Sequence, residues 1–173
     1  FYTGTTCPQN TDRLNLNARL TATAFRVSTG CTALTGFTFS PGDLYWDQKN
    51  MTVALKQTDE VTQQIGQELF IRAKNSGSST ISNGTVVYIT GSDTGDPTIN
   101  PARASETDRN VVTKVIGMTT EDISAGQTGF VTTVGVVRNI DTSSFTAGDT
   151  IYLSTSAFGQ LTTTKPVYPD FII

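Results

Sequence analysis

The stretch Asn83-Gly84-Thr85-Val86-Val87-Tyr88-Ile89-Thr90 decides the fold of this chain. It has a glycine turn followed by β-branched and aromatic residues, which is typical of a buried strand. The same residue types recur at Ala147-Gly148-Asp149-Thr150-Ile151-Tyr152-Leu153-Ser154, and a weaker copy begins at Ala125-Gly126-Gln127-Thr128-Gly129-Phe130-Val131. The copies are 42 and 22 residues apart, too irregular for a solenoid or propeller. We therefore expect each glycine turn to start a central strand of one compact barrel.

Composition supports an all-β chain. The 173 residues include 32 Thr, 13 Ser and 15 Gly, which favour strands and turns over helices. The strongest predicted strands are residues 111–118, 129–139 and 151–154, whose nearly continuous apolar character implies burial on both faces. Closure into a barrel, or an oligomer covering the outer face, would supply that burial. Residues 101–108 are expected to form one short helical turn, because proline suits its first position.

The first half is expected to be extended as well. Apolar residues occupy every second position of 14–24, which predicts a half-buried strand, with a short helix as the alternative. Residues 33–40 carry Phe37 and Phe39 on one face. A hairpin is predicted over 44–55 with its loop at 47–50.

Beyond the hairpin, residues 61–74 are expected to be extended with a break at Gly66. The Ser-, Gly- and Asn-rich residues 75–83 mark a boundary, although Ile81 indicates one packed point. The predicted organisation is an N-terminal extended arm over 1–41, a β-hairpin segment over 42–74, and a β-barrel or sandwich module over 75–173.

The residue inventory leaves little material for catalysis. Histidine is absent, which excludes Ser-His-Asp and Cys-His catalysis and every site with a histidine ligand. Cys7 and Cys31 are too few for a metal motif; two unbonded thiols are favoured, with a disulfide as the alternative. No phosphate-binding glycine loop is present. We therefore expect no enzyme, no cofactor and no metal site, although carboxylates occur in close pairs: Asp43/Asp47, Asp59/Glu60, Asp93/Asp96 and Glu121/Asp122.

Charge and hydropathy exclude two classes of partner. The formal net charge is −3, and the 12 Lys and Arg residues are scattered singly, so no nucleic acid is expected. Apolar runs reach only four or five residues, against about 20 for a membrane span, so no membrane is expected either. Residues 91–96 have the oxygen-rich composition of a calcium loop, but a turn between strands is the favoured interpretation.

One aromatic group stands out as a candidate contact site. Trp46 has Tyr45 beside it, and Phe37 and Phe39 lie just upstream. Aromatic residues on a hairpin are most often core or subunit-interface residues, and the alternative is a platform on which a sugar stacks.

Several segments from residue 42 onward carry a resemblance. They include Gly42-Asp43-Leu44-Tyr45-Trp46-Asp47, residues 61–68 and 72–75, residues 83–89, and the segments at 115–123, 129–138 and 148–153. This pattern resembles structural proteins of tailed-bacteriophage virions of the tail-fibre or head-fibre type, and it covers about residues 42 to 173. The second half is also similar to the small β-barrels of phage capsid decoration proteins.

The resemblance implies a non-enzymatic virion protein on the particle surface, usually a homotrimer, bound to other virion proteins of the head, neck or tail. Residues 1–41 would then be an attachment arm, 42–74 a trimerisation segment and 75–173 an outward module. Similar proteins continue into another strand beyond Ile173, so a longer polypeptide is expected.

Two other functions remain open. The first is a carbohydrate-binding adhesin that contacts a host surface glycan through Trp46 or through the loops at 92–96 and 157–160. The second is a hydrolytic spike that uses paired carboxylates, but a long repetitive β-helix would be needed for it, and the irregular repeat spacing argues against one.

Overall fold

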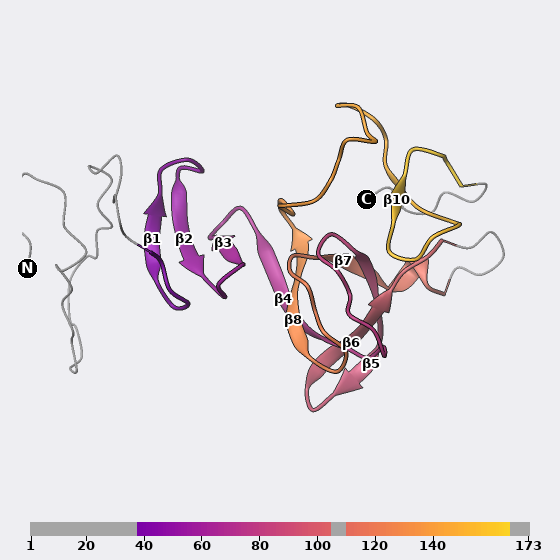
Figure 1. Cartoon of the computed structure of the whole chain (residues 1–173), viewed down its shortest axis with the longest axis horizontal. Coiled ribbons are helices and arrows are strands. Elements are labelled where there is room, and N and C mark those ends of the chain that lie inside the picture. The colour runs from indigo at the N-terminus through magenta and orange to yellow at the C-terminus, as the bar shows by residue number, and fades with distance from the viewer. Residues whose placement is uncertain (1–37, 105–109, 167–173) are drawn as a thin grey trace, which may run out of the picture. The chain divides into compact units, whose positions relative to one another are not determined.

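The computed structural model describes residues 38–104 and 110–166 (Figure 1). These residues form ten strands and one short 3-10 turn, which confirms the all-β prediction. They divide into two compact units, one ending at Gly66 and the other starting at Gln67. The predicted strand at 14–24, the side chain of Phe37 and both cysteines, Cys7 and Cys31, lie outside the described residues.

The first unit contains a three-stranded antiparallel sheet in the order β1-β2-β3. Its strands are β1 (Leu44–Asp47), β2 (Thr52–Lys56) and β3 (Thr62–Gln64). The predicted hairpin is confirmed, with Trp46 opposite Val53 and Asp47 opposite Thr52. The predicted break at Gly66 coincides with the last residue of this unit. Gly66 has a φ of 87°, a backbone conformation that glycine adopts at little cost.

The second unit is a closed five-stranded barrel in the order β4-β6-β5-β7-β8, which confirms the predicted barrel (Figure 1). Strand β4 pairs in parallel with β6 and antiparallel with β8, and this second pairing closes the barrel. The strands are β4 (Leu69–Asn75), β5 (Val86–Asp93), β6 (Asp96–Pro101), β7 (Val115–Thr119) and β8 (Thr128–Val134). The barrel therefore begins before residue 75, because β4 lies within the segment that the sequence analysis assigned to 42–74.

The start of strand β5 is buried on both faces. Val86 and Val87 point to opposite faces, and both are fully buried. Val87 belongs to the cluster inside the barrel, with Ile99 and Val131 among its members. Val86 packs outside with a second cluster that includes Leu153, so the chain's own C-terminal part covers β5.

Four predicted elements differ from the structure. Residues Val112–Lys114 form a 3-10 turn, η1, so β7 starts only at Val115; buried Val112 packs in the outer cluster. Strand β8 ends at Val134, because Gly135 follows with a φ of 127°. Of the predicted strand at 151–154, Tyr152–Leu153 form the short strand β9, which pairs with β10 (Leu161–Thr162). The described part of the predicted helical turn at 101–108 is not helical: Pro101 is the last residue of β6, and residues 102–104 have no regular structure. Residues 105–109 lie outside the described residues.

The three glycine turns of the sequence repeat have the same geometry. Gly84, Gly126 and Gly148 have φ values of 76°, 72° and 95°. Each is the third residue of a four-residue turn closed by a backbone hydrogen bond, with distances of 3.3, 3.0 and 3.0 Å. A positive φ at this position is the requirement of a type II turn, which glycine meets without strain. The first two turns start β5 and β8, as predicted, whereas the third precedes only the two-residue strand β9.

Candidate functional site

The aromatic group on the hairpin is only partly assembled. The rings of Phe39 and Tyr45 are stacked, with centroids 3.7 Å apart and planes 13° from parallel. Trp46 points to the opposite face of β1, because side chains alternate along a strand. Trp46 is half-buried, and its indole N–H is buried with no hydrogen-bond partner in the described part of the chain. The structure therefore brings Phe39 and Tyr45 together, but it does not place Trp46 beside them.

Several of the paired carboxylates serve as structural acceptors. Asp43 accepts a hydrogen bond from the Ser40 N–H at 2.9 Å, and Asp122 accepts one from the Asn83 N–H at 2.7 Å. Glu121 accepts one from the Phe130 N–H, and Asp93 forms an ion pair with Lys74. Each of these contacts holds a turn or joins two strands, so these carboxylates already have a structural role.

Asp47 anchors the β1–β2 turn. Its carboxylate accepts hydrogen bonds from the backbone N–H groups of Lys49 and Asn50, and from the side-chain amides of Asn50 and Gln64. Partial burial by itself raises the pKa of Asp47, but these hydrogen bonds stabilise the charged form and together hold the pKa below its ordinary value of 3.8. The group is therefore ionised and structural at neutral pH.

The suspected calcium loop is a tight hairpin turn. Asp93 pairs with Asp96 at the end of β5 and β6, and Thr94 and Gly95 between them have φ values of 50° and 97°. Positive φ at both central residues is the requirement of a type I′ turn. Within residues 38–104 and 110–166, no three acidic or sulfur-bearing side chains gather in a way that could hold a metal ion. Among the same residues no helix is long and apolar enough to cross a membrane.

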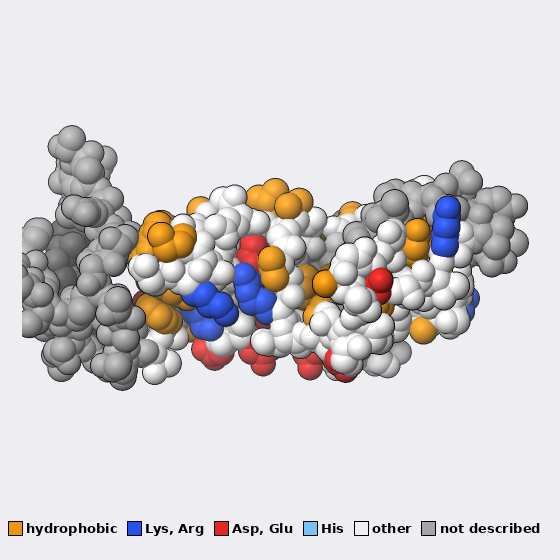
Figure 2. Space-filling model, turned by 90° about the horizontal axis from the view of Figure 1, so that it is seen from above, with side chains coloured by type: hydrophobic (Ala, Val, Ile, Leu, Met, Phe, Trp, Pro, Cys, Tyr) orange, Lys and Arg blue, Asp and Glu red, His pale blue; other side chains and the backbone are white. Residues whose placement is uncertain are grey.

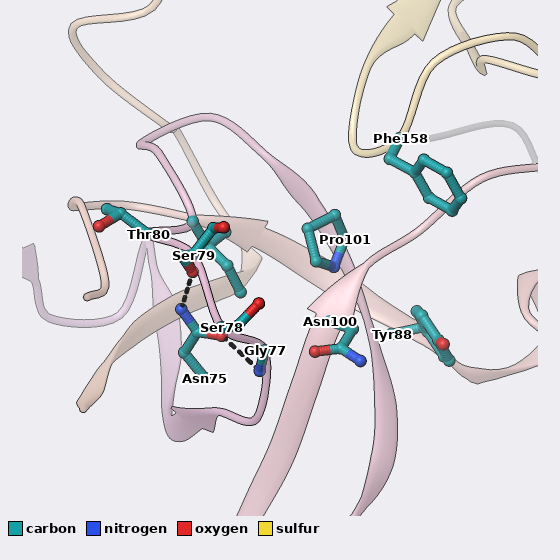
Figure 3. Close-up of a pocket in the computed structure, with 10 residues that line it drawn as sticks. Asn75, Gly77, Ser78, Ser79, Thr80, Tyr88, Asn100, Pro101 and Phe158 are labelled. Carbon is teal, nitrogen blue, oxygen red and sulfur yellow. Dashed lines mark hydrogen bonds between the residues drawn. The ribbon is translucent and has the colours of Figure 1, made fainter. Parts of the chain in front are cut away.

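One concave site on the barrel is a pocket of about 320 Å³ at the ends of β4 and β6. Figure 3 shows the loop 77–80 on one side, Tyr88 and Phe158 on the other, and Asn100 with Pro101 between them. None of the described residues that line the pocket is charged. Its wall combines aromatic rings with hydroxyl and amide groups, which is the composition of a site for an uncharged polar ligand.

Asn75 fixes the loop that forms one side of this pocket. Its side-chain NH₂ group donates to the carbonyls of Ser79 and Ile123 at 2.8 Å, and its Oδ1 accepts from the Gly77 N–H at 2.9 Å (Figure 3). Asn75 is fully buried at the end of β4. The loop is therefore held by the barrel, and its shape does not depend on a ligand.

Phe158 is held in place from the other side. The next residue, Gly159, donates its N–H to the Ala102 carbonyl and accepts a hydrogen bond from the Val86 N–H at 2.9 Å. Gly159 has a φ of 70°, and a Cβ there would lie 2.2 Å from Cγ2 of Thr85. Only glycine fits this position, so Phe158 is presented at the pocket by a fixed turn.

Phe158 itself is 61 % exposed, although it is a large aromatic residue. The guanidinium of Arg103 lies 4.4 Å from its ring centroid, a cation–π contact that orients the ring. Phe158 therefore presents an exposed aromatic ring at the mouth of the pocket.

The amide of Asn100 is oriented by a neighbour. Its Oδ1 lies 3.1 Å from the hydroxyl of Ser76, whereas its NH₂ group has no partner in the part of the chain that the structure describes. Tyr88 pairs with Asn100 across β5 and β6, and its hydroxyl likewise has no such partner there. Two donors beside the aromatic rings are thus available to a ligand.

A second pocket, of about 510 Å³, lies where the loop 139–151 covers the barrel. Ile140, Phe145 and Leu161 contribute apolar side chains to it, and Asp141 and Asp149 contribute carboxylates. Both carboxylates bind backbone N–H groups of their own loop, those of Ser143 and Thr146. The Ser143 backbone and hydroxyl lower the pKa of Asp141, so this acid supports its turn in the ionised form.

A group of exposed aliphatic residues lies where β4 begins and β8 ends. Leu69 is 60 % exposed and pairs directly with Val134, which is 59 % exposed. Val136, 57 % exposed, follows two residues later. On the face that Figure 2 shows, hydrophobic side chains reach the surface in small groups among uncharged polar ones, and Lys and Arg form no continuous stripe.

Sequence reasoning found part of the barrel pocket. The loop 157–160 was named as a candidate glycan contact, and Phe158 lies in it. Tyr88 was assigned to a core strand and Asn100 was missed, because nothing in the sequence shows which residues of β5 and β6 pair. Asn75 was placed at a domain boundary, whereas it is a buried anchor of the barrel.

No protein-family model matches the chain, and neither a curated protein nor a solved structure matches it. The resemblance to phage virion proteins therefore stays a prediction from the sequence motifs.

Proposed function

We propose that this chain is a non-enzymatic structural protein of a tailed-phage virion, a fibre or decoration element that assembles as a homotrimer on the particle surface. Other virion proteins of the head, neck or tail would be its partners. The observation that carries the proposal is the exposed aliphatic group of Leu69, Val134 and Val136 on an otherwise closed barrel. Apolar side chains that cluster on a surface mark a site of association.

The position of these residues supports a contact between copies. Leu69 and Val134 are cross-strand neighbours, so their side chains lie on the same side of the sheet. Next to them, buried Glu68 is bound by Arg138, which also contacts the Val136 carbonyl. This ion pair stiffens the backbone on which the aliphatic side chains stand.

The structural role of the carboxylates supports a non-enzymatic function. Asp43, Asp47, Glu121 and Asp122 each hold backbone N–H groups. The hydrolytic alternative also required a long β-helix, whereas the described C-terminal unit is a five-stranded barrel. The adhesin alternative through Trp46 is weakened, because this side chain is half-buried and stands apart from the Phe39–Tyr45 stack.

Multi-angle light scattering at micromolar concentration tests the assembly. We expect a mass three times the 18.5 kDa of one chain. Val134→Glu should shift the protein towards monomer, because it would bury a charge in the contact. Ser92→Glu adds the same charge to an exposed barrel position away from the group and should stay trimeric. A monodisperse monomer of the unsubstituted chain would overturn the assembly.

A further inference from the structure

We propose that the barrel pocket between the loop 77–80 and Phe158 binds a neutral saccharide unit. This binding site is independent of the assembly proposed above and would exist in a monomer or a trimer. Its volume of about 320 Å³ suits one or two sugar rings, with the lower bound of ordinary ligand pockets at about 300 Å³.

The first reason is the chemistry of the wall. A sugar ring has apolar C–H faces and a belt of hydroxyl groups, so it needs an aromatic surface and hydrogen-bonding groups in the same site. The pocket supplies aromatic rings in Tyr88 and Phe158, an amide in Asn100, and hydroxyl groups in Ser78 and Thr80 (Figure 3). A purely apolar ligand would leave these polar groups without partners, which is costly.

The second reason is charge. None of the described residues that line the pocket is an Asp, Glu, Lys or Arg. The nearest cation described above, Arg103, is engaged with the Phe158 ring. A phosphate or carboxylate ligand would find no opposite charge on the wall, which favours a neutral sugar over an anion.

The third reason is preorganisation. Asn75 binds the 77–80 loop with two hydrogen bonds and the Ile123 carbonyl with a third. Gly159 holds Phe158 in place through backbone hydrogen bonds to Val86 of β5 and to Ala102, which follows β6. A site whose walls are already ordered loses little entropy when a ligand binds. The groups available to the ligand are the Asn100 NH₂ and the Tyr88 hydroxyl, which have no hydrogen-bond partner among the described residues.

Saturation-transfer NMR on the full chain tests the site with four probes: the methyl glycosides of glucose, galactose, N-acetylglucosamine and rhamnose. We expect at least one to bind, with a dissociation constant in the millimolar range. Phe158→Ala should weaken that binding at least tenfold, because the stacking surface is lost, whereas Phe158→Tyr should retain it within threefold. Phe158 is exposed, so neither change threatens the fold.

Two further variants separate this site from others. Ser78→Trp should fill the pocket and abolish binding, while Phe145→Ala, which removes an aromatic ring from the loop 139–151, should leave it unchanged. No response to any of the four glycosides would overturn the proposal. Binding that survives both Phe158→Ala and Ser78→Trp, or that is lost in Trp46→Ala, would overturn it as well. A trimer without saccharide binding refutes only this site, and a saccharide-binding monomer refutes only the assembly.

Discussion

Ile81 and Ile123 pair across the barrel through two backbone hydrogen bonds of 2.9 and 2.8 Å, in which each residue donates to the other's carbonyl. Both residues precede a glycine turn by three positions, so the bridge joins the first two copies of the sequence repeat. The two turns are also alike in the hydrogen bond that the N–H of each glycine donates to the end of a barrel strand. The Gly84 N–H donates to the Thr119 carbonyl at the end of β7, and the Gly126 N–H donates to the Asn75 carbonyl at the end of β4.

The two glycine turns offer a matched pair of substitutions. Gly126→Ala should cost about 1 kcal/mol, because φ is positive but the space around it is open. Gly84→Ala should cost clearly more, because its Cβ would lie 2.3 Å from Cγ2 of Ile140. Urea unfolding of the two variants measures the difference. Equal losses of stability would show that the loop with Ile140 moves away at little cost.

Removing the amide of Asn75 should destabilise the barrel strongly. Asn75→Ala removes three hydrogen bonds, those to the Ser79 and Ile123 carbonyls and that from the Gly77 N–H, and we expect a loss of about 3 kcal/mol in the free energy of unfolding. Asn75→Asp should be at least as harmful, because it places a negative charge against carbonyl oxygens. Ser78→Ala, in the same loop but exposed, is the control and should change stability by under about 0.5 kcal/mol. The measurement is chemical denaturation, and a mild effect of Asn75→Ala would contradict the anchoring role.

Arg138→Ala should destabilise the barrel by about 2 kcal/mol. The Glu68 side chain is almost fully buried and would lose its ion-pair partner. Breaking a buried ion pair costs about 3 to 5 kcal/mol, and the partial exposure of Arg138 lowers that figure. Arg72→Ala removes an exposed arginine from β4 and should be nearly neutral. Thermal unfolding of both variants tests the difference, which would vanish if water could replace the Arg138 contact.

Asp47 should make the stability of the hairpin depend on pH in the acidic range. Its pKa is lowered in the folded state, so its contribution is fully present above 3.8, the unfolded value, and is lost as pH falls through the folded pKa. A carboxyl ¹³C NMR titration should place the Asp47 midpoint below 3.8. Asp47→Asn should be less stable than the unsubstituted chain at pH 7, and this difference should shrink at pH 2. A midpoint at or above 3.8 would contradict the role of the turn hydrogen bonds.

The sequence predicts the barrel well where one run of residues carries the information. The run Val86–Ile89 and the turns at Gly84 and Gly126 specify strand starts through local chemistry alone, and the structure confirms them. The end of β8 was missed because the predicted strand ran on through Gly135, whose positive φ ends it. The 3-10 turn at Val112 was missed because Val112 packs in the outer cluster, a tertiary contact. The pocket is harder to predict from the sequence than the strands are. Its walls come from residues 75, 77–81, 88, 100–101 and 158, which only the folding of the barrel brings together.

The pairing of β4 with β8 has a consequence for how the chain folds. The two strands that close the barrel are about 60 residues apart in sequence, and the parallel β4–β6 pair spans about 24. Such non-local contacts give a high contact order, so we expect folding in milliseconds to seconds rather than microseconds. During synthesis β4 has no antiparallel partner until β8 has left the ribosome. Until then its exposed edge is open to pairing with a neighbouring chain, a hazard that grows with the local concentration of nascent copies.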